Sequence, residues 1–344
     1  MRCRGKGIVR GMLPIPIEVV TLGESLVSLV AAQPGPLAEA HTFERVVAGA
    51  EANVAVGLAR LAHRVAYVGR VGDDAFGTVI LRRLRGEGVD VRHLQVDPGQ
   101  FTGMMARELR DLGPAEAIYH RAGSAGSRLS PADVEAAAQL FDGARWLHLT
   151  GITPALSASA AAAVDAAIDR ARACGLTVSL DLNIRRKLWP EERAVDALGR
   201  LSARVDVVFG GTDEAALVSG LARSLEAGAG VDPRRAAETL LDLGPTTAVI
   251  KLGAGGALQL GRDGVAVRHP GVRVPRSVDP VGAGDAFCAG YVAACLEGLA
   301  VEAALALGNA CGAAVVATVG DLSGLPSRAE AERLLAADGP DQLR

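Results

Sequence analysis

The second half of the chain alternates short apolar runs with longer stretches of helical spacing, and this alternation constrains the fold more than any other feature. The β-like runs cover residues 146–149, 177–181, 205–209 and 247–252. Strands that alternate with helices predict a parallel sheet with helices on both faces, so we expect a doubly wound, mostly parallel α/β fold. A first core strand is expected over residues 18–23, and Glu24 and Ser25 follow it at the carboxyl end, where such folds place ligands.

Two stretches interrupt this pattern and predict a second, smaller sheet. Residues 26–47 and 100–121 carry short β-like runs, and Asp111-Leu-Gly-Pro114 within the second stretch has the chemistry of a hairpin turn. We therefore expect one domain over residues 18–344 with a small β insertion. Residues 1–17 hold four basic residues and no acid, and they lack the apolar run of a signal peptide. We expect this extension to be disordered, with Met12 as an alternative start.

Composition argues against several kinds of partner. The net charge of -3 gives no reason to expect nucleic acid or an anionic membrane surface as a partner. No uninterrupted apolar run is long enough to span a bilayer. Five cysteines without CxxC spacing fit reduced thiols in a cytoplasmic protein. Since only 3% of residues are aromatic, Ala, Val and Leu must fill the core.

A glycine turn that opens a helix lies at residues 278–290 (Val-Asp-Pro-Val-Gly-Ala-Gly-Asp-Ala-Phe-Cys-Ala-Gly). Asp279 and Pro280 end a β-like run over residues 272–278, and helical spacing follows the glycines. Free N–H groups at a helix start attract a phosphate or a developing oxyanion. Asp285 adds a carboxylate to this anion site. It is either the base that removes a proton from an attacking hydroxyl or an acid that offsets the helix dipole.

Other nucleotide and metal motifs are missing from the sequence, which has no GxxxxGK[ST], no GxGxxG between a strand and a helix, and no histidines at metal-ligand spacing. Residues 251–256 (Lys-Leu-Gly-Ala-Gly-Gly) end a predicted strand with three glycines. Such a segment lets a nucleotide approach the backbone, or it forms a strand-to-strand hairpin. Asn309 lies among apolar residues of the last helix, as a buried, satisfied amide or as a contact to a base.

Two arginine clusters indicate an anionic small-molecule substrate. Tyr119-His-Arg121 ends the predicted β insertion, and Asp181-Leu-Asn183-Ile-Arg185-Arg186 follows a core strand. Arginine is suited to bidentate capture of a carboxylate or a phosphate. The alternative is that Arg185 and Arg186 are solvated and that Arg121 pairs with an acid on the surface.

The order of two of these segments resembles the two signatures of the ribokinase-like (PfkB-type) carbohydrate kinases. They are Gly49-Ala-Glu-Ala-Asn53-Val-Ala near the start and Asp279-Pro-Val-Gly-Ala-Gly-Asp285-Ala-Phe near the end, and the resemblance covers about residues 18–337. It implies a ribokinase-like fold whose small β-sheet is a lid, and phosphoryl transfer from ATP with Mg²⁺ to a sugar hydroxyl. It further implies a homo-oligomer formed through the lid, and it leaves open whether a monovalent cation such as K⁺ is needed near Asp279.

Within the family, further runs are similar to members that phosphorylate 2-keto-3-deoxygluconate to 2-keto-3-deoxy-6-phosphogluconate at its terminal hydroxyl. These runs begin at Tyr119, Leu147, Asp181 and Gly320. The resemblance implies that Asp285 is the catalytic base and that Glu214 lies near the magnesium site through a water. The residues implied to contact the sugar acid are Gly49, Asn53, Tyr119, Arg121, Arg185 and Asp321. Those implied to hold ATP are Asn183, Lys251, Gly253, Gly256, Gly282, Ala283, Gly284 and Asn309.

The chain departs from the family pattern at three places, and the first of them, at Met105, leaves the exact sugar open. Met105 stands where an aromatic substrate contact is common, and Ala48-Gly49 replaces a Gly-Gly pair. The segment Gly211-Thr-Asp-Glu214 keeps the glutamate of a metal motif and loses its asparagine. A kinase of fructose or of 5-dehydro-2-deoxygluconate is therefore an alternative, as is a sugar-binding protein without turnover.

Overall fold

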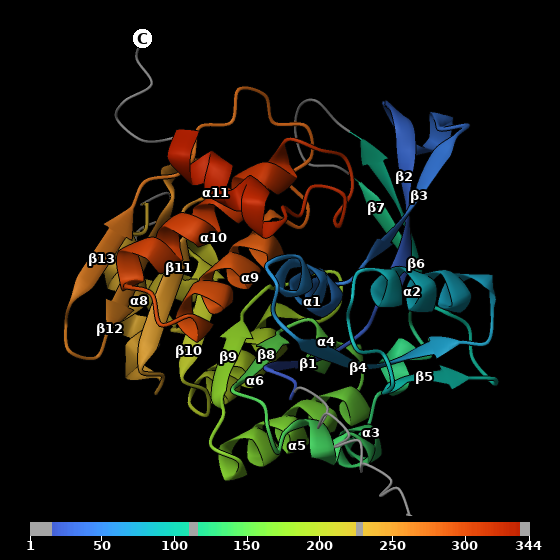
Figure 1. Ribbon diagram of the computed structural model, residues 1–344, viewed down its shortest axis with the longest axis horizontal. Coiled ribbons are helices and arrows are strands. Elements are labelled where there is room, and N and C mark those ends of the chain that lie inside the picture. Colours follow the sequence, from blue (N-terminus) through green and yellow to red (C-terminus); the bar gives the residue numbers. More distant parts are fainter. Residues whose placement is uncertain (1–15, 110–115, 225–229, 338–344) are drawn as a thin grey trace, which may run out of the picture.

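A nine-stranded sheet forms the centre of the computed structural model, which describes residues 16–109, 116–224 and 230–337 (Figure 1). Neighbouring strands are parallel in the order β5 (Leu94–Asp97), β4 (Val65–Gly72), β1 (Val19–Leu22), β8 (Trp146–Thr150), β9 (Thr177–Asp181), β10 (Val207–Gly211) and β11 (Thr247–Lys251). The strands β12 (Ala257–Gly261) and β13 (Ala266–His269) extend one edge in antiparallel fashion. The predicted mostly parallel sheet is confirmed.

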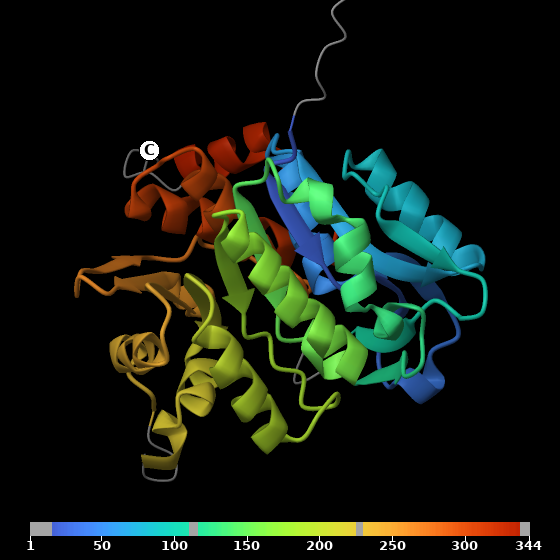
Figure 2. The same cartoon turned by 90° about the horizontal axis from the view of Figure 1, so that it is seen from below.

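Helices cover both faces of this sheet, as the alternation predicts (Figure 1, Figure 2). One face carries α1 (Ala50–Arg60), α2 (Ala75–Gly86), α9 (Ala283–Leu296), α10 (Val301–Val316) and α11 (Arg328–Ala337). The other face carries α3 (Pro131–Ala136), α4 (Thr153–Leu156), α5 (Ala158–Ala173), α6 (Glu191–Ser202), α7 (Thr212–Val218) and α8 (Pro233–Asp242). None of the helices within the described ranges is long and apolar enough to cross a membrane.

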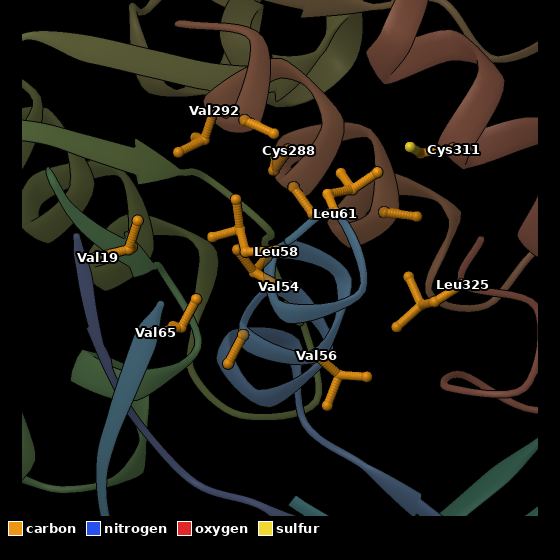
Figure 3. Packing of buried hydrophobic residues seen from close by; sticks show 14 of the residues in the cluster. Val19, Val54, Val56, Leu58, Leu61, Val65, Cys288, Val292, Cys311 and Leu325 are labelled. Atoms are coloured by element: carbon orange, nitrogen blue, oxygen red, sulfur yellow. The ribbon is translucent and has the colours of Figure 1, made fainter. Parts of the chain in front are cut away.

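Small side chains fill the core, as the low aromatic content requires. In α5 the buried residues recur every three or four positions, namely Ala160, Ala163, Val164, Ala167, Ile168 and Ala171. The helices α1 and α9 can pack closely because Gly57 has no side chain: a methyl group there would lie only 2.7 Å from Ala289 Cβ. Figure 3 shows the surrounding cluster of buried side chains, which includes Leu58 of α1 and Val292 of α9.

A separate four-stranded sheet stands beside α1 and α2 and confirms the predicted β insertion (Figure 1). Its strand order is β3 (Phe43–Ala48), β2 (Leu26–Pro34), β6 (Met104–Leu109) and β7 (Ala117–His120). The β2 strand pairs in antiparallel fashion with β3 and in parallel fashion with β6. We call this sheet the lid. The predicted turn at residues 111–114 and the extension up to residue 15 lie outside the described residues.

One local expectation changes in the structure, and one of two stated alternatives is found. Residues 272–278 form an irregular loop and not a strand, because the N–H groups of Val278 and Asp279 donate to Val316 O of α10 at 2.8 and 3.2 Å. The glycines Gly253–Gly255 form a 3₁₀ turn between the antiparallel strands β11 and β12, which is the hairpin alternative. Both segments flank the edge of the sheet where the site lies.

Candidate active site

A cavity of about 400 Å³ lies between the lid and the carboxyl ends of β9, β10 and β11. This is the edge of an open α/β sheet where ligands bind. Its lining combines lid residues, residues that follow the core strands and residues of the glycine turn: Met105, Arg107, Ala117, Tyr119, Asn183, Arg185, Glu214, Lys251, Pro280, Val281, Gly282, Gly284 and Asp285. Segments that are far apart in the sequence therefore meet in one cavity of ligand size.

Asp285 lies in the first turn of α9, directly after the left-handed Gly282 at the N-cap (φ 85°). The Asn53 amide donates to its Oδ2 at 2.7 Å, and the Asn183 amide donates to its Oδ1 at 3.1 Å. Burial raises the pKa of Asp285 to about 7; the negative charge of Asp181 adds to the rise, while the Asn53 hydrogen bond opposes it. A carboxylate with this pKa can exchange a proton near neutral pH.

Asn183 follows β9 with a positive φ of 39° and bridges two carboxylates. Its amide donates to Asp285 at 3.1 Å and to Asp181 Oδ2 at 3.3 Å. Asparagine tolerates the left-handed region better than most residues, which fits its place at this turn. Asn183 therefore lies beside the candidate base and lines the same cavity.

A buried ion pair lies beneath the start of α9. Lys251 Nζ, at the end of β11, lies 2.7 Å from both carboxylate oxygens of Asp181, at the end of β9. Burial alone would lower the pKa of Lys251, but the charge of Asp181 raises it above its ordinary value, so the ammonium stays charged. A methyl group at Gly284 would lie 3.2 Å from Nζ, so this glycine leaves room between the helix start and the cation.

The start of α9 forms an anion site above this ammonium. The N–H of Ala283 donates to Pro280 O at 3.3 Å, whereas Gly284 and Asp285 occupy helix positions without an intrahelical acceptor. Their N–H groups add to the positive end of the helix dipole. Lys251 and the helix start together favour a negatively charged group in this part of the cavity.

The hairpin turn after β11 packs on the loop that follows β13. Gly253 has a φ of 55° and open space where a side chain would lie, whereas a side chain at Gly256 would overlap His269 O. Asn309 of α10 donates to Pro270 O at 2.9 Å in the same loop. Asn309 is thus a nearly buried amide with a partner, the first of the two predicted alternatives, and it fixes the loop beside the turn.

The lid and the loop after β9 provide the side of the cavity suited to a sugar acid. Met105 and Tyr119 are paired across β6 and β7, and both line the cavity. Arg185 is exposed and lines it from the core. Asn53 and Asp321 lie next to the base, with Asn53 Nδ2 3.4 Å from Asp321 Oδ2.

Two residues predicted to contact the sugar, Gly49 and Arg121, lie against Glu24, a buried residue where the chain passes from core to lid. Arg121 donates from Nε to Glu24 Oε2 at 2.7 Å and does not line the cavity. A methyl group at Gly49 would collide with Glu24 O, and one at Gly103 would collide with the Glu24 carboxylate. Arg121 is held there because a buried carboxylate needs a cation. Its guanidinium carbon also lies 5.8 Å from the centre of the Tyr119 ring.

Glu214 lines the cavity, and both of its carboxylate oxygens accept hydrogen bonds from backbone N–H groups. Ile184 N–H donates to its Oε1 at 2.7 Å, and Gly211 N–H donates to its Oε2 at 2.8 Å. Among the described residues no group of three or more His, Cys, Asp or Glu side chains could hold a metal ion. The donor set therefore fits a Mg²⁺ that arrives on phosphates and keeps its waters, and does not fit an all-protein metal cage.

Sequence reasoning missed Arg107, a lid residue that is only 4% exposed and whose guanidinium forms an ion pair with Asp279. The sequence could have indicated Arg107, because residues two apart on a strand lie on the same face. Met105 was already expected near the substrate, so Arg107 could have been expected on the same face of the strand.

A mostly parallel α/β sheet, a lid sheet and a carboxylate at a helix start define a carbohydrate phosphotransferase. The profile of the pfkB family carbohydrate kinase matches residues 17–328, and the chain belongs to this family. The resemblance inferred from the two signatures is thereby confirmed.

Individual relatives match over nearly their whole length. The chain is 41% identical over 327 residues to a 2-dehydro-3-deoxygluconokinase of Thermoproteus tenax, which covers 93% of this chain and 95% of that protein. A 2-dehydro-3-deoxygluconokinase of Bacillus subtilis is 37% identical over 324 residues, covering 93% and 96%.

Solved structures share the fold. An Escherichia coli protein described as ribokinase II, in complex with ATP and Mg²⁺, has a TM-score of 0.82 and 27% identity over 93% of this chain and 99% of that chain. A Vibrio cholerae fructokinase variant with bound fructose, ADP and potassium ion has a TM-score of 0.77 and 26% identity over the same shares.

Proposed function

We propose that this protein is an ATP-dependent kinase of 2-keto-3-deoxygluconate (2-dehydro-3-deoxygluconate), which it phosphorylates at the terminal hydroxyl to give 2-keto-3-deoxy-6-phosphogluconate. The observation that carries the chemistry is Asp285, a buried carboxylate with a pKa of about 7 at the start of α9. The identity of 41% and 37% to two 2-dehydro-3-deoxygluconokinases supports the substrate.

In the proposed mechanism Asp285 takes the proton from the terminal hydroxyl as that oxygen attacks the γ-phosphorus of ATP. The bond from this phosphorus to the β-phosphate oxygen breaks, and ADP leaves. Asn53 and Asn183 hold the two carboxylate oxygens in place. The N–H groups at the start of α9 and the Lys251 ammonium offset the charge of the transferring group, since phosphoryl transfer depends mainly on positioning and electrostatics.

We place the ATP phosphates against Gly282, Ala283 and Gly284, and the rest of the nucleotide along the Gly253–Gly256 turn, with Asn309 shaping the adjoining loop. The open space at Gly253 supports this path. Mg²⁺ bound to the phosphates would neutralise part of their charge, and Glu214 would contact it through a water. The complex of the Escherichia coli relative with ATP and Mg²⁺ supports this choice of nucleotide and ion.

We assign recognition of the substrate carboxylate to Arg185 with Tyr119. Arg185 is exposed and lines the cavity, and no carboxylate of the described residues forms an ion pair with it; its charge lowers the pKa of Asp285. Arg121 supports the Tyr119 ring from behind, because Glu24 already engages its guanidinium. Asn53 and Asp321 would bind sugar hydroxyls near the base, and Gly49 would let the substrate approach the start of α1.

We further propose a cytoplasmic homo-oligomer that pairs through the lid. The outer strands β3 and β7 carry exposed apolar side chains, with Phe43 39% and Ile118 58% exposed. Apolar side chains on edge strands favour association with a second sheet. Cys174, Cys288, Cys295 and Cys311 are free thiols, which supports a reducing compartment. Light scattering of the wild type and of Ile118→Lys tests the assembly; an equal mass for both would refute pairing through β7.

The decisive experiment measures ADP release from ATP with Mg²⁺ in the presence of four sugars: 2-keto-3-deoxygluconate, 2-keto-3-deoxygalactonate, 5-dehydro-2-deoxygluconate and fructose. We expect the highest kcat/KM with 2-keto-3-deoxygluconate. A higher kcat/KM with fructose would refute the assigned substrate. Binding of a sugar without any ADP release would refute catalysis itself.

A further inference from the structure

Asp279 joins two loops of the site. It precedes the glycine turn and is only 2% exposed. Its Oδ1 accepts a hydrogen bond from Val281 N–H at 3.2 Å, one residue before the turn that starts α9. Its Oδ2 accepts one from Gly320 N–H at 3.2 Å, one residue before Asp321. The Asp279 carboxylate thus fixes both the anion site and the loop that carries Asp321.

A buried carboxylate in this position requires a positive charge. Arg107, from lid strand β6, provides it: Nη1 donates to Asp279 Oδ1 at 3.4 Å, and Nη2 pairs closely with Oδ2. Nη2 also lies 3.9 Å from Asp321 Oδ1. One guanidinium of the lid therefore lies between two acids of the core.

A monovalent cation near Asp279 does not fit this arrangement. Hard cations bind through several oxygen ligands, but both Asp279 oxygens already accept backbone N–H groups and the guanidinium. A cation beside them would also lie against the charge of Arg107. A fructokinase variant of Vibrio cholerae, by contrast, was solved with a potassium ion bound.

We propose that Arg107 takes the place of the monovalent cation at Asp279, so that a positive charge carried by the lid organises the anion site and the enzyme works without K⁺. Arg107 is a positioning residue here: it acts on the transferring group through Asp279 and the Val281 N–H. The kinetic consequences of this inference rest on the proposed kinase function. The prediction that K⁺ does not bind at Asp279 rests on the Arg107–Asp279 contact alone.

The first test uses the unmodified protein. Its kcat and KM for ATP and 2-keto-3-deoxygluconate are measured in potassium, sodium and tetramethylammonium chloride at equal ionic strength, together with its melting temperature. We expect no difference between the three salts. A rate or melting temperature that rises to saturation with K⁺ and not with tetramethylammonium would overturn the proposal.

The second test compares Arg107→Ala, Arg107→Lys and, as a matched control, Arg45→Ala, which removes an exposed arginine of lid strand β3. Arg107→Ala should lower kcat/KM by about a hundredfold through misplacement of the anion site. It should also make the melting temperature and activity rise with K⁺. Arg107→Lys should stay insensitive to K⁺ but lose part of kcat/KM, because one ammonium replaces a bidentate fork. Arg45→Ala should match the wild type.

Normal kinetics in Arg107→Ala, or a loss with no response of activity or melting to K⁺, would overturn the inference. If Arg107→Ala does not fold, the salt comparison on the wild type and on Arg107→Lys decides. If the wild type turns over no sugar in any salt, the proposed function fails, whereas the melting temperatures still test whether Arg107 excludes K⁺.

Discussion

Replacing Asp285 with asparagine separates the role of this residue in catalysis from its role in the fold. The substitution keeps the size of the side chain and removes the proton acceptor. General-base catalysis contributes about a hundredfold to ten-thousandfold, so we expect kcat/KM to fall by at least about a hundredfold. In the wild type, kcat/KM should rise with pH and level off above about pH 7, because the base must be ionised and its pKa is about 7.

The free energy of unfolding of the wild type should fall as the pH rises, whereas its kcat/KM rises. A pKa raised from 3.8 to about 7 means that the ionised Asp285 destabilises the folded protein by roughly 4 kcal/mol above pH 7. The folded state holds the proton more tightly than the unfolded chain, so stability falls as the pH rises between these values. Asparagine removes this cost, but its NH₂ group faces the amide of Asn53 or Asn183, which costs about 1–3 kcal/mol.

The variant should therefore be nearly inactive and yet melt at a higher temperature than the wild type at pH 8, an advantage that shrinks at pH 5. Coupled ADP release measures the activity, and circular dichroism measures the melting. Asp242→Asn, at an exposed position at the end of α8, is the control and should change neither. An Asp285→Asn protein that binds both substrates and retains near-normal turnover would refute the assignment of the base.

Three further substitutions probe the rest of the site. Arg185→Ala should raise KM for 2-keto-3-deoxygluconate by roughly tenfold to a hundredfold and leave KM for fructose unchanged. Replacing Arg186, whose side chain is 77% exposed, should change neither KM. An equal effect of Arg185→Ala on both sugars would exclude carboxylate capture. Lys251→Met leaves the buried charge of Asp181 unpaired and should lower the free energy of unfolding by about 3–5 kcal/mol in urea titrations, so an unchanged midpoint would contradict the buried pair. Gly284→Ala adds a methyl group 3.2 Å from Lys251 Nζ and should raise KM for ATP more than KM for the sugar; the reverse order would displace the phosphates from this helix start.

The architecture was accessible from the sequence because the central parallel strands are buried on both faces and therefore read as apolar runs, unlike the partly exposed edge strand β5. β9 was predicted with the bounds Thr177–Asp181 that it has in the structure. The lid was predictable for a different reason, namely turn chemistry and short runs outside the helical alternation. The run at residues 272–278 misled because β-branched residues alone do not make a strand when no neighbouring strand supplies hydrogen bonds.

The site was predictable in its backbone features and less so in its charge pairs. The glycine turn indicates a helix start, and Asp285 lies within it, so local sequence carried that part. The partners of Arg121 and Arg107 are Glu24 and Asp279, 97 and 172 residues away in the chain. Such pairing depends on how the lid sits on the core, which a pattern of neighbouring residues does not record. This is why Arg121 was assigned to the substrate. The place of Arg107 on the cavity face of β6 could have been inferred from Met105, but its partner Asp279 could not.

The chain segments that connect the core to the lid come together at Glu24. The chain crosses between core and lid after Glu24, at Gly49, at Gly103 and at Arg121, and the last three positions each contact Glu24. The crossings between core and lid are thus gathered around one buried carboxylate, and the two glycines place no side chain between the chain and Glu24. We therefore expect that a residue inserted at one of these crossings would change how the lid sits on the core without altering any residue that lines the cavity.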